Sequence, residues 1–503
     1  MKLAVEMEKP KDQEEKEEIS SSVGPKDMVD MYSQSATIHG VSKVGAPQIY
    51  KFRRIIWISL LIAMSISLSC IVYLQFRRYQ EHPSMTIVKA EFNDELIFPA
   101  VTICNTNQYH RSRLPDDVPL LNLLYNLSEF AHIGKYLNFT KDETNQGPVS
   151  ITHHTGDYLY SFAMAAAHTL EEMFHLCSWK GRQINCSDIF KRAVTDVGVC
   201  YRFNGNTSDV LTTTTTGSRS GLRVILDIQQ NFSFFSTTSQ SGIKVLLNEQ
   251  NESPNLSSHG LFVRPGTSTA LGVRKEERIG LESPYKAFGT SYCYNTRAEG
   301  FETPLKRFAN YTYTRSTCQR NCVLKHMFKQ CNCRHFFSPG EEDYCSLEQL
   351  EHCYIPTFTD KEMEEVVHKC TACPSRCHTI SYNTQLSSAD FASSFIIDYM
   401  VDAGMIQDSD YIRNNVIDLR IFYDTLTVTK TEQIPELTIH GILADLGGHL
   451  GLFLGASILS LTELVEFVAL YIMEWWKRRR QKKPKSSSPN QQQMTVMDNV
   501  AMS

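Results

Sequence analysis

Fourteen of the fifteen cysteines in this 503-residue chain fall in one region, between Cys104 and Cys377. The remaining one, Cys70, sits inside an apolar run. Disulfides persist in oxidising compartments and are rare in the cytosol, where thiols are kept reduced. An even number of cysteines gathered in one segment therefore predicts a disulfide-rich domain that faces the outside of the cell.

Acceptor sites for N-linked glycans mark the same region. These Asn-x-Ser/Thr triplets occur only between the first and the last of the fourteen cysteines. They begin at Asn126, Asn138, Asn185, Asn206, Asn231, Asn251, Asn255 and Asn310. Because two independent patterns coincide, we expect this part of the chain to be extracellular and glycosylated.

Two apolar segments flank the cysteine-bearing region. The run from Ile55 to Leu74 has no charged residue and is long enough to cross a bilayer as a helix. A second apolar segment, from about Leu437 to Trp476, is followed at once by seven basic residues between 477 and 485. Basic clusters of this kind mark the cytoplasmic side of a membrane. Two spans with an internal C-terminus also place the N-terminus inside.

These patterns predict a plasma-membrane protein that crosses the lipid bilayer twice. The expected parts are a cytoplasmic segment (1–50), a first span (51–76), an extracellular domain (77–436), a second span (437–476) and a basic cytoplasmic tail (477–503). The net charge of -5 has no dominant basic block in the middle of the chain, which argues against nucleic acid as a partner. No catalytic or phosphate-binding motif is present, so we expect neither an enzyme nor a cofactor or metal.

The second apolar segment is not typical of a helix that faces only lipid. It carries Asp445, Glu463 and Glu466, and such residues are costly in hydrocarbon unless they face water or partners. In a continuous helix, Asp445 and Glu463 would lie on one face because eighteen residues make five turns. Carboxylate rings from several subunits would concentrate cations. The alternative, pairing with bases on the first span, finds no base between residues 55 and 74.

One stretch of this segment resembles a known family. The sequence Gly447-Gly-His-Leu-Gly-Leu-Phe-Leu-Gly-Ala-Ser457 is similar to the second span of the degenerin, epithelial sodium channel and acid-sensing ion channel family. His39-Gly40 resembles the family's cytoplasmic gating motif, and Phe98–Asn105 resembles its entry into the extracellular domain. The fourteen cysteines follow the order and approximate spacing of the acid-sensing branch.

The resemblance implies a homotrimer or heterotrimer that conducts sodium ions and is blocked by amiloride. Each subunit would have two transmembrane helices and a large α+β disulfide-rich extracellular domain with palm, β-ball, finger, thumb and knuckle. It also implies that the second span breaks at a selectivity filter, whose backbone carbonyls narrow the pathway, and it implies a gate, further pore carboxylates and a wrist contact between two aromatic rings. The residues in these roles would be Gly455, Ala456 and Ser457 (filter), Ala444, Asp445 and Gly448 (gate), Glu463 and Glu466 (pore), and Tyr79 with Phe288 (wrist).

Seven disulfide pairs are implied by the same resemblance, and spacing alone would leave the pairing open. They are Cys104–Cys200, Cys177–Cys186, Cys293–Cys377, Cys318–Cys373, Cys322–Cys370, Cys331–Cys353 and Cys333–Cys345. A zinc site at Cys370, Cys373, Cys377 and His378 is the alternative that the spacing permits.

The sequence leaves the gating stimulus open. Acid-sensing members carry a carboxylate-rich finger segment, whereas Asn231–Gln240 here contains no acid. An extracellular agonist, either protons or a short peptide, remains the expectation. Phe232, Phe234 and Phe235 would either bind such a peptide or form the core of the finger. Alternatives are a constitutively open or mechanically gated sodium channel, or a non-conducting cell-surface receptor; an ATP-gated trimer ranks far behind.

Overall fold

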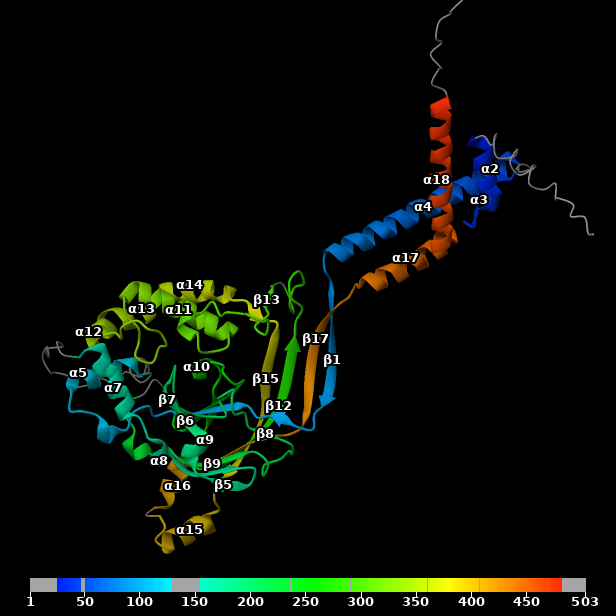
Figure 1. The fold of residues 1–503 in the computed structure, drawn as a ribbon. Coiled ribbons are helices and arrows are strands. Elements are labelled where there is room, and N and C mark those ends of the chain that lie inside the picture. Colours follow the sequence, from blue (N-terminus) through cyan, green and yellow to red (C-terminus); the bar gives the residue numbers. More distant parts are fainter. Residues whose placement is uncertain are drawn as a thin grey trace, which may run out of the picture. The chain divides into compact units, whose positions relative to one another are not determined.

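The computed structural model of this chain describes residues 25–46, 50–128, 154–235, 238–289, 291–359, 361–406 and 408–481. The predicted sequon Asn138 and most of the predicted basic tail lie outside these residues. The chain divides into two compact units (Figure 1). We call Met1–Pro83 with Glu436–Ser503 the helical unit, and Ser84–Pro435 the strand-rich unit.

The strand-rich unit is built on a large mixed sheet. Its strand order is β1-β17-β12-β16-β9-β4-β5, with β15 also paired to β12. β12 runs parallel to β16 and β17 but antiparallel to β15. The strands are β1 (Ser84–Phe92), β4 (Phe174–Trp179), β5 (Arg182–Ile184), β9 (Leu222–Asp227), β12 (Thr267–Ile279), β15 (His378–Asp390), β16 (Val416–Tyr423) and β17 (Thr427–Pro435).

A second sheet of five strands packs on part of the first. Its order is β11-β10-β3-β7-β6. Apolar side chains that alternate along both sheets meet in one core; Phe98, Phe203 and Leu419 are each fully buried there. The strands are β3 (Ala100–Asn105), β6 (Phe190–Thr195), β7 (Gly198–Phe203), β10 (Ile243–Asn248) and β11 (Leu261–Val263). Shorter pairs join β2 (Leu96–Ile97) to β8 (Thr212–Thr213) and β13 (Cys293–Tyr294) to β14 (Ser375–Arg376).

Helices of the strand-rich unit form a second core. Leu120, Leu159 and Leu350 pack there with neighbouring apolar residues from three separate segments. The helices are α5 (Val118–Leu127), α7 (Gly156–Ala166), α8 (Leu170–Met173), α9 (Cys186–Ile189), α10 (Leu256–His259), α11 (Arg315–Cys331), α12 (Leu347–Gln349), α13 (Ile355–Thr359), α14 (Lys361–Lys369), α15 (Ser394–Asp402) and α16 (Ser409–Asn415).

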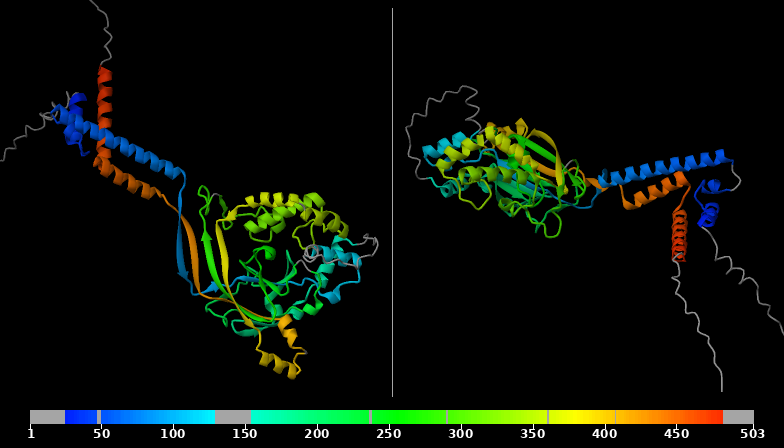
Figure 2. Two further views of the ribbon diagram at one scale, coloured as in Figure 1. Left: turned by 180° about the vertical axis from the view of Figure 1, so that it is seen from behind. Right: turned by 90° about the horizontal axis from the view of Figure 1, so that it is seen from above.

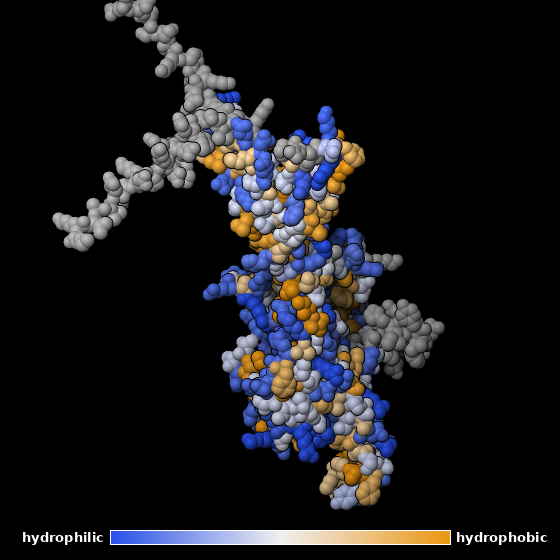
Figure 3. All heavy atoms as spheres, turned by 90° about the vertical axis from the view of Figure 1, so that its right-hand side faces the viewer, coloured by the Kyte–Doolittle hydropathy of each residue, from blue (hydrophilic) through white to orange (hydrophobic). Residues whose placement is uncertain are grey.

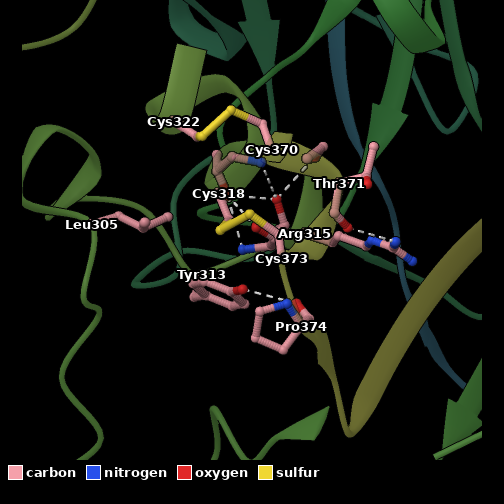
Figure 4. Close-up of a disulfide and its surroundings, with 12 residues drawn as sticks. Leu305, Tyr313, Arg315, Cys318, Cys322, Cys370, Thr371, Cys373 and Pro374 are labelled. Carbon is pink, nitrogen blue, oxygen red and sulfur yellow. Dashed lines mark hydrogen bonds between the residues drawn. A yellow bond between two sulfur atoms is a disulfide. The ribbon is translucent and has the colours of Figure 1, made fainter. Parts of the chain in front are cut away.

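Two disulfides link α11, the longest of these helices, to the segment that follows α14. Cys318 on α11 pairs with Cys373, and Cys322, one turn later, pairs with Cys370 (Figure 4). In the same view Tyr313 donates a hydrogen bond to the Pro374 carbonyl at 2.8 Å. Such cross-links restrict the unfolded chain and so stabilise a region whose helical core is small. All seven bonds are the pairs that the resemblance implies.

The helical unit holds the two predicted spans. One helix, α4 (Lys51–Gln80), is long and apolar enough to cross a membrane, and Leu68 is its one buried residue in the described chain. It continues past the predicted end of the first span at residue 76. Ile55, Ile62 and Ile66 of α4 are exposed on the isolated chain. Figure 3 shows apolar residues, in orange, on the surface of the part of the molecule drawn towards the top.

The second predicted span is two helices. α17 (Ile439–Leu454) and α18 (Ile458–Gln481) meet at a bend of 74° (Figure 2). They meet the length and composition of a span only when taken together. The condition under which Asp445 and Glu463 would align, a continuous helix, is therefore not met, because the two carboxylates lie on different helices. The unit is completed by α2 (Pro25–Ser35) and α3 (Val41–Gly45).

Candidate functional site: an interrupted helix and the segment bound to it

The break between α17 and α18 coincides with the Gly-Ala-Ser triplet. Gly455 ends α17 in the left-handed conformation, with φ of 57°, and donates its N–H to the Gly451 carbonyl. Glycine occupies this region at no steric cost. Ser457 and Ser460 then cap α18 reciprocally, because each backbone N–H donates to the other side chain, at 3.1 and 3.3 Å. The bend is thus stabilised at both ends by local hydrogen bonds.

His39 of the predicted gating motif contacts this break directly. Its backbone N–H donates to the Leu454 carbonyl at 3.1 Å, and its Nδ1 lies 3.1 Å from the Gly455 carbonyl oxygen. Because a carbonyl can only accept, Nδ1 must carry the proton. A Cβ atom at Gly455 would stand 1.8 Å from His39 Nδ1. The close approach therefore requires glycine at this position for a steric reason as well.

Thr37 extends the contact along α18. Its backbone N–H and its Oγ1 donate to Glu463 Oε2 at 3.3 and 2.9 Å, and Oγ1 also lies 2.6 Å from Ser460 Oγ. Hydrogen bonds to an ionised acceptor are stronger than neutral ones. Glu463, predicted as a pore carboxylate, is in this structure the anchor of the N-terminal segment.

Two further contacts hold the segment in place. Gly40, with φ of 89°, turns the chain into α3 beside Trp57 and Leu61 of α4, where a Cβ would meet side-chain atoms at 3.3 to 3.5 Å. The ring of Tyr32 stacks on Phe467 of α18 with centroids 4.3 Å apart. The segment 32–40 therefore contacts both apolar elements of the helical unit.

The predicted gate lies on α17. Gln75 of α4 donates through Nε2 to Asp445 Oδ2 at 2.8 Å. Asp445 therefore has a neutral hydrogen-bond partner, which follows directly after the uncharged run Ile55–Leu74. Ala444 and Gly448 are exposed on the isolated chain, and a Cβ at Gly447, Gly448 or Gly451 would meet no atom within 4 Å. This side of α17 has room for another helix to approach closely.

The remaining predicted sites are the wrist contact, Glu466 and the sequons. Tyr79 belongs to the helical unit and Phe288 to the strand-rich unit, so their wrist contact stays a prediction. Glu466 is exposed on α18. The sequon residues are at the surface where they are described; only Asn255 among them is partly covered. The exposed ones are Asn126, Asn185, Asn206, Asn231, Asn251 and Asn310.

Sequence reasoning missed a cluster in the strand-rich unit formed by His110, His168 and Glu172. One ligand-type atom from each lies within 4.8 Å of the others. Asn107 Nδ2 donates to His168 Nε2 at 2.9 Å, and His168 Nδ1 then donates to Gln229 at 3.1 Å. Burial lowers the pKa of His168 to about 4. The two histidines are 58 positions apart, so only the folded chain reveals the pair.

Comparisons with known proteins agree with the resemblance. A family model described as amiloride-sensitive sodium channel matches residues 32–467. Acid-sensing ion channel 1 of Gallus gallus is 28% identical over 470 residues, which cover 90% of this chain and 85% of the relative. Acid-sensing ion channel 4-B of Danio rerio is 27% identical over 445 residues, with 87% and 75% covered. Acid-sensing ion channel 2 of Homo sapiens is 27% identical over 462 residues, with 88% and 86% covered.

Among solved structures, a proton-activated chloride channel matches with a TM-score of 0.30 and 8% identity, over 82% of this chain and 96% of that chain. Similarity at this level carries no argument about fold or ion. The family match is different, because it spans the helical unit, the strand-rich unit and the break at Gly455. The protein is therefore an ion channel by class, and the chain belongs to the amiloride-sensitive sodium channel family, as the resemblance predicted.

Proposed function

We propose that this chain is a subunit of a ligand-gated, sodium-selective, amiloride-sensitive cation channel of the plasma membrane, with both termini in the cytoplasm. Three copies, identical or related, would surround one pore. The observation that carries the proposal is the interruption of the second apolar segment at Gly455, inside a chain whose family is that of sodium channels. Extended backbone at membrane depth is tolerated where it lines water.

The residues of the break would supply the filter. Between α17 and α18, the chain at Gly455, Ala456 and Ser457 leaves helical geometry, so carbonyl groups are freed from intrahelical bonds. Rings of carbonyl oxygens can replace the water around a permeating ion. The Gly455 carbonyl is held by His39, so the N-terminal segment would keep the filter in shape.

Gating would involve the exposed side of α17. Ala444 and Gly448 have small side chains, which allow helices from neighbouring subunits to meet and close the path. Asp445, held by Gln75, would place a carboxylate near this constriction in each subunit and attract cations. The stimulus would be extracellular, either protons or a short peptide.

Patch-clamp recording from cells that express this chain alone tests the proposal. Sodium-carried current that appears after acid steps or peptide application and is blocked by amiloride is the expected result. Asp445→Lys and substitution of Ser457 should reduce it strongly, whereas Arg182→Gln, an exposed change on β5, should not. Purified protein in sodium-loaded vesicles that passes no alkali-metal ion under any of these stimuli would refute it.

A further inference from the structure

The strand-rich unit contains a cavity of about 810 Å³ that no part of the proposed conduction path uses. Its walls come from α7, β6, β7, the first half of α11 and the loop 334–344. Figure 1 shows these elements in one region of the unit. The volume is within the range of ordinary small-ligand sites.

The charge of this cavity is unusual. Among its lining residues are five bases and two acids, Asp188 and Asp209. The bases are Lys191, Arg192, Arg202, Arg320 and Arg334. No ion pair to a carboxylate joins any of the four arginines within the described part of the chain, whereas Arg307 beside the cavity is paired with Glu342 at 2.6 Å. The lining therefore carries an excess of positive charge, which an anionic ligand would offset.

Arg202 gives the most specific indication. It is 9% exposed, and its Nη1 donates to the Glu252 carbonyl at 2.8 Å, while its buried Nε has no hydrogen-bond partner. Buried polar groups nearly always find a partner. Gly205 packs closely against that atom, since a Cβ there would lie 2.6 Å from Nε. Burial lowers the pKa of Arg202 and of Arg320 more than the neighbouring carboxylates Glu252 and Asp196, respectively, raise it.

Arg320 is likewise available. Its guanidinium lies 5.7 Å from the Phe308 ring centroid, and within the described residues it makes no hydrogen bond or ion pair. Arg334 is held by stacking 3.7 Å over Tyr344 and by donating to the Ser338 carbonyl at 2.7 Å. Both groups are thus positioned by neutral partners that leave their charge uncompensated.

The remaining wall is aromatic. Tyr160 stacks on Tyr344 with centroids 4.8 Å apart, and Phe336 and Phe337 line the same space. A ligand that suits this cavity has an apolar or aromatic portion together with several negative charges. The bases come from four separate segments, which suits charges spread along a molecule better than one compact anion.

We infer that this cavity binds a short acidic peptide, one that carries carboxylates beside an aromatic or large apolar side chain. Where the proposed channel function holds, such a peptide would be its extracellular agonist or modulator; the binding itself does not depend on conduction. The inferred site does not include Phe234 and Phe235, whose rings pack against each other with centroids 5.0 Å apart.

Equilibrium binding to the full-length chain in lipid nanodiscs tests the site. The chain is first deglycosylated because the sequon residue Asn206 lies at the cavity. The probe is dansyl-Glu-Phe-Glu with a free C-terminal carboxylate, its matched control is dansyl-Gln-Phe-Gln-amide, and ATP is the competing anion. The acidic probe should bind at least tenfold more tightly than the neutral one, and rising salt should weaken it.

Variants locate the binding. Arg320→Gln should weaken the acidic probe at least tenfold without lowering the melting temperature, Arg320→Lys should retain most of the affinity, and Arg182→Gln should match the wild type. Arg192→Gln, at an exposed position, serves if Arg320→Gln does not fold. Equal affinity for both probes, an unchanged Arg320→Gln, or tighter binding of ATP would overturn the inference. Binding in a chain that passes no sodium would instead overturn only the proposed function.

Discussion

The Nδ1 atom of His39 donates a hydrogen bond to the carbonyl oxygen of Gly455, across 416 positions of sequence. This bond joins the N-terminal segment to the break in the second apolar segment. Together with the Thr37 contacts it makes the break between α17 and α18 a composite of two distant parts of the chain. Removing either part should therefore disturb the other.

Gly455→Ala should displace the N-terminal segment. The left-handed backbone costs a non-glycine residue about 1–2 kcal/mol, and the new Cβ would overlap His39 Nδ1. Docking can be measured by oxidative cross-linking of Thr37→Cys to Ser460→Cys in a Cys70→Ser background, because the native Oγ atoms are 2.6 Å apart. We expect cross-linking to fall severalfold.

The matched control is Gly451→Ala, on the same helix, where an added Cβ meets no atom of the chain within 4 Å. Cross-linking there should match the parent. Equal yields in the two alanine variants would show that Gly455 does not hold the segment.

Glu463→Gln should weaken the same docking by about 1 kcal/mol, since the backbone N–H of residue 37, which the cysteine substitution retains, would face a neutral amide in place of a carboxylate. The cross-linking assay reports it as a reduced initial rate. Glu466→Gln, one turn along α18 and exposed, is the comparison that should leave the rate unchanged. If both changes slow the reaction equally, the effect comes from net charge and not from the Thr37 contact.

Replacing Ala444 by phenylalanine should hold the pore open. Because Ala444 is exposed on the single chain, the larger ring meets no clash within the subunit and can act only where helices of different subunits approach. We expect a severalfold rise in amiloride-sensitive resting current, with Ala444→Ser close to the wild type. A resting current unchanged by the phenylalanine, at equal surface expression, would contradict the assignment of the gate.

Mild acid should destabilise the strand-rich unit through His168. Its pKa is lowered to about 4 from 6.5 by burial, so between these values the unfolded chain binds a proton that the folded chain does not. Stability therefore falls as pH drops from 6.5 to 4 and levels off below. The shift corresponds to at most about 3 kcal/mol.

Melting temperatures of wild type and His168→Gln at pH 7.5 and 4.5 measure this effect. The variant should be less stable at pH 7.5, because it loses ring contacts, but should lose less on acidification. His259→Gln, at an exposed position, controls for removing a histidine. An identical acid-induced loss in all three proteins would exclude His168 as the source.

Local sequence features predicted the individual segments of this protein. The features that they did not predict depend on contacts between residues that are distant in the sequence. The uncharged run at Ile55–Leu74 was sufficient to predict α4, because bilayer length and charge exclusion act along one segment. The break at Gly455 followed from the resemblance, since the apolar pattern alone continues through it. Asp445 and Glu463 were placed on one face only because periodicity assumes a straight helix.

The arginines of the cavity are a feature that the sequence alone could not predict. Arg192, Arg202, Arg320 and Arg334 lie in four segments of ordinary composition, and each alone is typical of a surface charge. Only the fold brings them to one space, where they outnumber the carboxylates of Asp188 and Asp209. The finger phenylalanines were ambiguous for the same reason: Phe232 stacks on His110 with centroids 4.3 Å apart, while Phe234 packs on the helical core.

β1 and β17 pair antiparallel from Ser84 opposite Pro435 to Phe92 opposite Thr427, so the strand-rich unit starts and ends at neighbouring positions of one ribbon. Its 84–435 stretch is therefore an insertion whose two ends already meet. Such a segment can be excised, circularised or exchanged between homologues without rethreading the chain, and a tight turn in its place would still connect the two apolar segments. A force transmitted along the chain from this unit reaches the two apolar segments at two adjoining backbone junctions.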